Sequence, residues 1–326
     1  MRTVYLDQNK WIDLARAATG HAQGARYAPV LVELRRARSE GRAQFPLSTV
    51  HYFETGRASD PQRRLDVATV MMEISGGVTI APPHSIVPWE LECALLDACG
   101  ITGQPVPELE IFGRGAAHAF NEPAIGYRAP EVWEGVPLSD PTRTLLNATL
   151  GPAMELCILA DQLPGVSDVP RLAFNDHKQA NDAAFVAGQE QVRDYLATAG
   201  KHRLDDAMLG TAIGDILDLI LRTCLRLKID PLPLFDNPPL LAEILDKMPS
   251  RWVEMQLRRL RQSNPQKAWE GNDLNDVTAL SIAVPYCDVV VTERMWAGMI
   301  TQGNVASRFN TTVISKLDDL VDLLEP

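Results

Sequence analysis

The chain has 326 residues, of which 46% are hydrophobic and 22% charged, and its formal net charge is −11. This length permits one large domain or two of ordinary size, and the apolar fraction is high enough to bury a core. The negative charge excludes binding of nucleic acid or anionic membrane through overall charge. A polyanionic partner therefore requires a local basic patch or bridging metal ions.

Cysteine usage and the start of the chain indicate a cytoplasmic protein. The five cysteines are scattered and form no CxxC pair, which is typical of reduced thiols rather than of disulfides or a zinc site. The sequence enters a β-prone run at once, so we expect no signal peptide. The most apolar stretch, Met208–Leu227, contains four charged residues, so we expect no membrane association.

The N-terminal part of the sequence alternates between strands and helices. A strand is predicted over Thr3–Leu6, and Asp7 follows it directly. A later helix begins near Ser48 or Thr49 and carries Glu54. The remaining predicted elements up to the double proline at 82–83 are helices Trp11–Ala18, Tyr27–Arg42 and Leu65–Ile74 and the strand Val78–Ala81.

The middle of the chain, about residues 84–262, has helical patterning separated by Pro/Gly-rich connectors. No strand is predicted there. The expected helices are Trp89–Ala98, Thr142–Gln162, Asp176–Thr198, Asp205–Leu227, Pro239–Lys247 and Ser250–Gln262.

The α/β pattern returns near the C-terminus. The continuous apolar run Asp288–Thr292 predicts a strand that is buried on both faces of a parallel sheet. It stands among helices Asp273–Val284, Trp296–Ile300 and Leu317–Leu324 and a strand over Thr311–Ile314. We therefore predict an α/β fold: a parallel sheet flanked by helices, formed from both chain ends (1–83 and 265–326), with an all-helical insertion at 84–264.

Carboxylates stand where ligand chemistry collects in such a fold. Asp7 and Glu293 follow predicted strands, and ligands bind beyond the carboxyl ends of parallel strands. Glu54 lies on a helix, and Asp273 and Asp276 open the helix that leads to the Asp288–Thr292 strand. Like charges at close range require a cation, and carboxylate oxygens suit Mg²⁺ or Mn²⁺. Such ions support hydrolysis of a phosphodiester.

The segments that carry these acids resemble the PIN-domain nucleases. The matching residues are Leu6-Asp7-Gln8-Asn9-Lys10-Trp11-Ile12, Pro46-Leu47-Ser48-Thr49 with Glu54, Asp276 at a helix start, and Val289-Val290-Val291-Thr292-Glu293-Arg294. The resemblance covers roughly residues 1–82 and 270–326. It implies a PIN-like fold and divalent-metal-dependent endoribonuclease activity, with Asp7, Glu54 and Asp276 in the main acid positions and Glu293 in the fourth, where the family more often has Asp.

The hypothesis assigns roles to further residues. Asp7, Glu54, Asp276 and Glu293 are the expected catalytic and metal-binding residues, with Asn9, Asp273 and Thr292 supporting them by position. The expected contacts to the phosphates of a single-stranded RNA substrate come from local arginines, which are Arg57, Arg251, Arg258 and Arg261. A protein partner or inhibitor bound by the insertion, and a role as a toxin or defence nuclease, rest on analogy.

Other interpretations stay open. Each acid on its own also suits a simpler role, such as a helix cap, a turn or an exposed side chain. A non-catalytic PIN-like adaptor that binds protein or RNA through the insertion, and a DNA-acting or structure-specific nuclease, fit the same residues. A dehalogenase-type phosphatase is disfavoured because Asn9 stands where that chemistry needs a second Asp. The spacing of Arg16 and His21 matches an all-helical ribonuclease family but lies after a strand, which is the wrong context.

Overall fold

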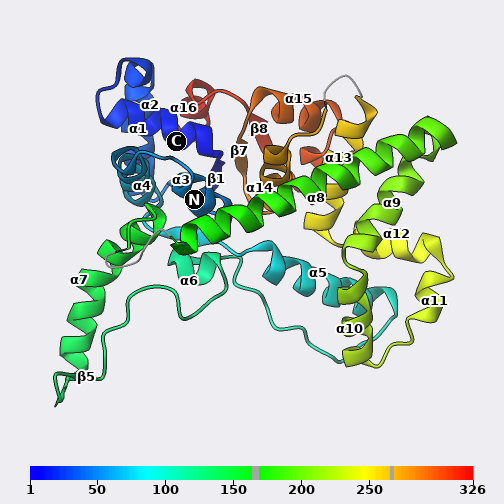
Figure 1. Ribbon diagram of the computed structural model, residues 1–326, viewed down its shortest axis with the longest axis horizontal. Helices are drawn as coiled ribbons and strands as arrows, with labels where there is room; N and C mark the ends of the chain where they lie inside the picture. Colours follow the sequence, from blue (N-terminus) through cyan, green and yellow to red (C-terminus); the bar gives the residue numbers. More distant parts are fainter. Residues whose placement is uncertain (164–168, 265–267, 326) are drawn as a thin grey trace.

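The computed structural model describes residues 1–163, 169–264 and 268–325. A four-stranded parallel sheet lies at its centre, in the order β2-β1-β7-β8 (Figure 1). The strands are β1 (Arg2–Leu6), β2 (Ala43–Gln44), β7 (Val289–Val291) and β8 (Thr312–Ile314). Both chain ends therefore share one sheet, as the sequence predicts, with Leu6 opposite Val291 in the pairing of β1 with β7.

Helices cover both faces of this sheet, because the strand side chains alternate between two cores. Val4, Leu6 and Val291 point into the first core, which is covered by α1 (Gln8–Ala18), α2 (Ala28–Ser39), α3 (Thr49–Gly56), α4 (Pro61–Ser75), α16 (Asp318–Leu324) and the short turn η1 (Ala22–Tyr27). Tyr5 and Val290 point into the second core, which is covered by α13 (Pro249–Ser263), α14 (Gly271–Tyr286), α15 (Arg294–Gln302) and η3 (Ala306–Phe309).

The middle of the chain builds a third core from helices. Its members run from Leu91 on α5 (Pro83–Ala98) to Met248. The long helix α8 (Val169–Ala199) crosses the molecule beside α14 (Figure 1). The other elements of this part are α6 (Gly115–Ala119), α7 (Asp140–Leu159), η2 (Lys201–Arg203), α9 (Leu204–Asp215), α10 (Leu217–Leu227), α11 (Leu232–Phe235) and α12 (Pro238–Asp246).

Two expectations for this middle part are wrong in detail. It contains strands: β4 (Phe112–Arg114) pairs antiparallel with β3 (Val78–Ile80), and β5 (Val132–Trp133) forms a hairpin with β6 (Val136–Pro137). These strands are two or three residues long, too short to show a period in the sequence. The helix expected over Asp205–Leu227 is broken at Ile216, where φ is −118° and ψ is 15°. The two residues before the break, Gly214 and Asp215, are poor helix formers.

The predicted division at residues 83 and 264 does not coincide with a gap in the packing. Ala119 and Leu159 from the middle part belong to the first core, and Val253 and Leu257 belong to the second. Residues 164–168 of the predicted insertion, and 265–267 at the start of the predicted C-terminal part, lie outside the described residues.

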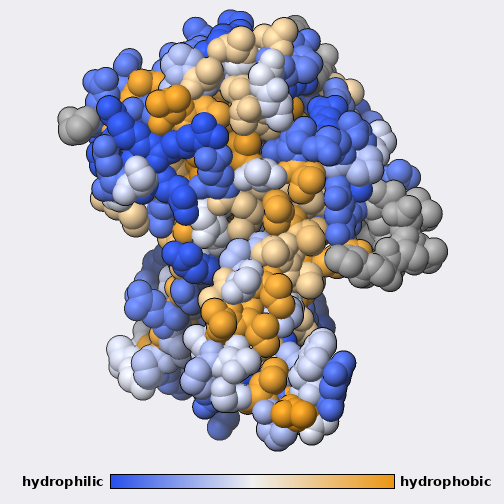
Figure 2. All heavy atoms as spheres, turned by 90° about the vertical axis from the view of Figure 1, so that its left-hand side faces the viewer, coloured by the Kyte–Doolittle hydropathy of each residue, from blue (hydrophilic) through white to orange (hydrophobic). Residues whose placement is uncertain are grey.

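The surface of the middle part carries apolar side chains on the projecting α7 and the β5–β6 hairpin. Trp133, Val136 and Leu145 are each at least 60% exposed. Figure 2 shows apolar side chains gathered on the lower half of the face that includes this projection. Across the described ranges, no helix is long and apolar enough to span a bilayer.

A buried histidine fixes the helix that carries Glu54. His51 is fully buried, and its Nδ1 accepts a hydrogen bond from the Ser48 backbone N–H at 2.8 Å. Its Nε2 lies 2.8 Å from the carbonyl oxygen of Leu6, the last residue of β1. Burial lowers the pKa of His51 to about 4, so the ring is neutral at neutral pH. Because Glu54 lies one helical turn further on, this ring sets its position relative to the end of β1.

Replacement of His51 tests this link. His51→Ala removes two buried hydrogen bonds and leaves a cavity, so we expect the free energy of unfolding to fall by about 2–4 kcal/mol in urea denaturation. The matched change at the exposed His202, His202→Ala, is expected to stay within about 0.5 kcal/mol of the wild type. Equal losses in the two variants would contradict the role given to His51.

Candidate metal centre

A pocket of ≈310 Å³ lies at the carboxyl ends of β1 and β7 and is lined mainly by acids and amides. The four expected catalytic residues, Asp7, Glu54, Asp276 and Glu293, all line it, and so does Asp273. They come from both ends of the chain, and the parallel pairing of β1 with β7 brings them together. The other lining residues are Gln8, Asn9, Ile12, Glu270, Asn272 and Met295.

Asp7 is held at the junction of β1 and α1. Its backbone has extended geometry, which is typical of an N-cap, and its Oδ1 accepts a hydrogen bond from the Gln8 N–H at 2.7 Å. Its Oδ2 accepts from the hydroxyl of Thr292 at 3.0 Å. Thr292 follows β7 directly and is fully buried, so the paired strand ends fix this carboxylate in place.

Glu54 and Asp276 are each oriented by one neutral donor. The Asn275 amide donates to Glu54 Oε1 at 2.8 Å, and the Trp296 indole N–H donates to Asp276 Oδ2 at 2.8 Å. No described residue donates to the second oxygen of either carboxylate. One oxygen of each group is therefore available to a ligand in the pocket.

Glu293 and Asp273 differ from these three residues. Glu293 is exposed at the start of α15, and its Oε1 accepts from the Asn9 amide at 2.9 Å. Asp273 is 4% exposed, and its carboxylate is occupied by hydrogen bonds within the protein. Its Oδ2 accepts from the Glu270 backbone N–H at 2.9 Å, which closes a capping box, and from Arg261 at 3.2 Å.

The buried acids destabilise one another as charged groups. Burial, followed by the neighbouring Asp7, Glu293 and Glu54 charges, raises the pKa of Asp276 to about 8. Burial also raises the pKa of Asp7 and of Glu54, and each feels another acid of the pocket. A bound cation would offset this repulsion, so the cluster of carboxylates favours cation binding.

The oxygen atoms that line the pocket are suitable ligands for a hard divalent cation, although the side chains are not arranged at coordinating distances from a single point. Among residues 1–163, 169–264 and 268–325, no group of three or more His, Cys, Asp or Glu side chains is placed to hold a metal ion as it stands. Two amide oxygens beside the acids, Asn9 Oδ1 and Gln8 Oε1, are buried without a hydrogen-bond partner. Carboxylate and amide oxygens with unused lone pairs are ligands for Mg²⁺ or Mn²⁺.

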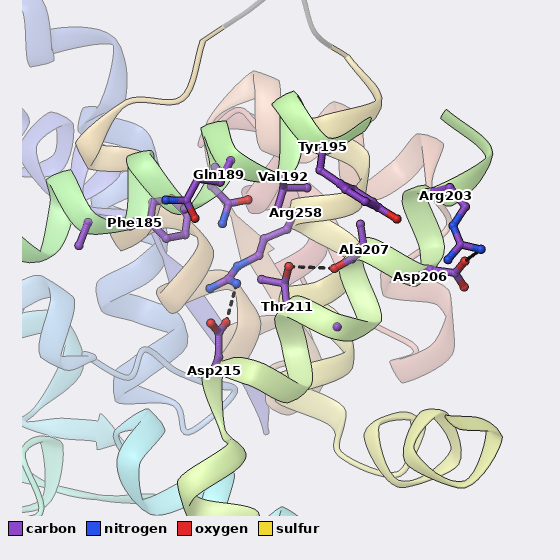
Figure 3. A pocket seen from close by; sticks show the side chains of 14 residues that line it. Phe185, Gln189, Val192, Tyr195, Arg203, Asp206, Ala207, Thr211, Asp215 and Arg258 are labelled. Atoms are coloured by element: carbon purple, nitrogen blue, oxygen red, sulfur yellow. Dashed lines mark hydrogen bonds and ion pairs between the residues drawn. The ribbon is translucent and has the colours of Figure 1, made fainter. Parts of the chain in front are cut away.

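The structure does not bring the predicted arginine cluster to the surface. Arg251, Arg258 and Arg261 are buried, and they pair with Glu254, Asp215 and Asp273 inside the protein. Their expected contact with RNA phosphates is therefore wrong, because acids of α9, of α14 and of α13 itself occupy these guanidinium groups. Arg258 instead lines a separate cavity beside α8 and α9 (Figure 3).

Arg57 is the predicted phosphate contact that lies at the pocket. It is exposed, and its guanidinium donates to Asn272 Oδ1 at 3.0 Å at the rim. Its contact with a substrate phosphate stays a prediction.

Some residues that shape the pocket were not singled out from the sequence. Asn275 is next to Asp276 in the sequence, and a side-chain amide beside a predicted site acid could have indicated a hydrogen-bond donor to the pocket. Trp296 lies three residues after Glu293 and reads as a core residue, so nothing in its pattern indicates a bond to Asp276. Lys178 lies close enough to Glu54 to favour its charged form, and it pairs with Asp182 at 2.7 Å.

Comparison of the chain with protein-family models, with curated proteins and with solved structures finds no match.

The pKa of Asp276 predicts a dependence of stability on pH in metal-free buffer. The folded-state pKa of about 8 exceeds the usual pKa of an aspartate, 3.8, so the folded protein holds this proton more tightly than the unfolded chain. The stabilisation is complete below pH about 4 and is lost as the pH rises through about 8. Asp276→Asn is expected to flatten this fall in urea unfolding followed across that range, while Asp319→Asn, at an exposed site, keeps it. If the free energy of unfolding fell with pH at the same slope in both variants, the raised pKa of Asp276 would be refuted.

Proposed function

We propose that the protein is a divalent-metal-dependent endoribonuclease that hydrolyses phosphodiester bonds of single-stranded RNA. The observation that carries the proposal is the pocket in which Asp7, Glu54, Asp276 and Glu293, from both chain ends, meet at the carboxyl ends of paired parallel strands. The PIN-like motif supports it, because the four acids of the motif all line the pocket. The strand order and the flanking helices are compatible with a PIN-like fold.

In this proposal each residue of the pocket has a defined task. Asp7, Glu54 and Asp276 hold Mg²⁺ or Mn²⁺ through the oxygens that face the pocket. When bound, the ion supplies Lewis acidity: it lowers the pKa of a water and neutralises charge that develops on the phosphodiester. Thr292, Asn275 and Trp296 fix the three carboxylates. Glu293, oriented by Asn9, completes the acidic cluster, and Arg57 at the rim contacts a substrate phosphate.

Two alternatives make different predictions. A non-catalytic adaptor has one observation in its favour, the exposed apolar side chains on α7 and the β5–β6 hairpin, which suit a protein partner. A DNA-acting nuclease uses the same acids and differs in its substrate alone. A role as a toxin or defence nuclease would follow from the RNase activity and requires a test in cells.

Cleavage assays test the proposal directly. We expect the purified protein with Mn²⁺ to cut an end-labelled single-stranded RNA, and Asp7→Asn or Asp276→Asn to slow the cleavage by about 100-fold or more. Asp319→Asn, a matched change outside the pocket, is expected to keep the wild-type rate. Equal cleavage by all four proteins would mean that the pocket is not the active site. Cleavage of single-stranded DNA but not RNA would favour the DNA-acting alternative.

Metal binding is measurable without substrate. Mn²⁺ at about 100 times its Kd should stabilise the folded state by about 2.7 kcal/mol, seen as a rise in the melting temperature relative to EDTA. Asp7→Asn is expected to lose most of this rise. The adaptor alternative predicts no metal-dependent change in the wild type, so an unchanged melting temperature would favour the adaptor.

A further inference from the structure

A second and larger cavity, of ≈610 Å³, lies between α8, α9 and α13 and shares no lining residue with the acidic pocket (Figure 3). Phe185, Gln189 and Tyr195 line it from α8, and Thr211 and Asp215 line it from α9. Arg258 contributes from α13. The volume falls within the range of small-molecule sites, about 300–1,000 Å³.

Glycines on both walls keep this cavity open. Gly188 in α8 and Gly210 in α9 both line it, and a Cβ at either position would meet no atom within 4 Å. Glycine inside a helix destabilises it relative to alanine, and close packing does not require glycine at these two positions. What the two glycines do provide is room between the helices.

A buried amide in the wall has an unused donor. Gln189 is 2% exposed, and its backbone and side-chain oxygens accept from the Gln262 amide at 2.7 and 3.4 Å. Its Nε2 donates to no group in the part of the chain that the structure describes. Because Gln189 lines the cavity, this nitrogen is free to donate to a ligand that carries an acceptor.

The charges around the cavity are already compensated. Arg258 pairs with Asp215 at 2.6 Å and with Glu254 at 2.5 Å, and at the other end Arg203 pairs with Asp206 at 2.9 Å. A phosphate or carboxylate would have to break one of these pairs. The ligand that fits is therefore uncharged.

Aromatic side chains lie at both ends of the cavity. Arg258 already stands over the Phe185 ring, 5.3 Å from its centroid. Tyr195 is 44% exposed and lies at the opposite end, near Arg203 and Asp206 (Figure 3). Its ring offers a stacking surface to a flat ligand.

We propose that this cavity binds a nucleobase, with the base stacked on Tyr195 and one of its edges accepting a hydrogen bond from the Gln189 amide. Glutamine amides pair with base edges in this way, and stacking on an aromatic ring suits any base. The base belongs either to a free nucleoside or to a single-stranded RNA. The inference does not depend on nuclease activity, because the site shares no residue with the acidic pocket.

The test measures binding in EDTA, so that no metal-dependent cleavage takes place. Adenosine, guanosine, cytidine and uridine, and separately a short fluorescent single-stranded RNA of mixed sequence, are titrated into the full-length protein. Tyr195→Ala is expected to weaken binding by about 5- to 150-fold, which corresponds to the loss of one stacked base. Gly210→Leu fills the cavity and should abolish binding.

Gly214→Leu is the matched control. Gly214 lies one turn further along α9, does not line the cavity, and also has open space around it. Both leucine variants replace a helical glycine by a better helix former, so their melting temperatures should equal or exceed that of the wild type. Loss of binding in Gly210→Leu alone then cannot be attributed to unfolding.

The outcomes distinguish the two sources of the base. Binding of a nucleoside that Gly210→Leu abolishes and Gly214→Leu preserves supports a free-nucleoside site. The same pattern with the RNA alone supports a base of an RNA chain. No binding of any probe, or binding that is equal in the two leucine variants, would overturn the proposal.

Discussion

The parallel pairing of β1 with β7 is the contact on which the candidate site depends. Its register sets Leu6 opposite Val291, so the next residues, Asp7 and Thr292, meet at one edge of the sheet and are joined by a 3.0 Å hydrogen bond. A slip by one residue would exchange the faces of the strand and separate these groups. The other acids arrive on helices adjoining the same strands: α3 is tied to β1 through His51, and α14 leads into β7.

The acidic pocket lowers the stability of the folded protein, and this loss of stability indicates that the pocket has a function. Buried carboxylates that raise one another's pKa destabilise the folded protein at neutral pH, and the buried amide oxygens of Gln8 and Asn9 are left without donors. Burial also raises the pKa of an acid outside the pocket, Glu90, but hydrogen bonds from neighbouring groups favour its charged form. Glu90 is 2% exposed and accepts from Ser250 and from Tyr286 at 2.6 Å. Uncompensated groups collected in one pocket are typical of a site that binds something.

The sequence predicts three of the four sheet strands, β1, β7 and β8, and the acids at the strand ends because those signals are local; the two-residue β2 is too short to predict, and the predicted strand at Val78 pairs with β4 outside this sheet. An apolar run predicts β7. Once a strand has been located in the sequence, the acid that directly follows it is also located at the end of that strand. The arginines of α13 show where such reasoning stops. Their helical spacing shows that Arg258 and Arg261 share a face, but that face turns inward because Asp215 of α9 and Asp273 of α14 pair with it. The short strand β4 depends in the same way on its partner β3.

The central sheet also has a consequence for the order in which the protein is made. Strand β1 lies between β2 and β7, and β7 begins at Val289, 287 residues after β1 begins. Until β7 has been synthesised, one edge of β1 has no partner, and the side chains of β7 are missing from both cores beside it. Pairings so distant along the chain form slowly, and an unpaired edge invites association with other chains. During synthesis of the helical middle, β1 therefore has an unpaired edge that is open to association with other chains.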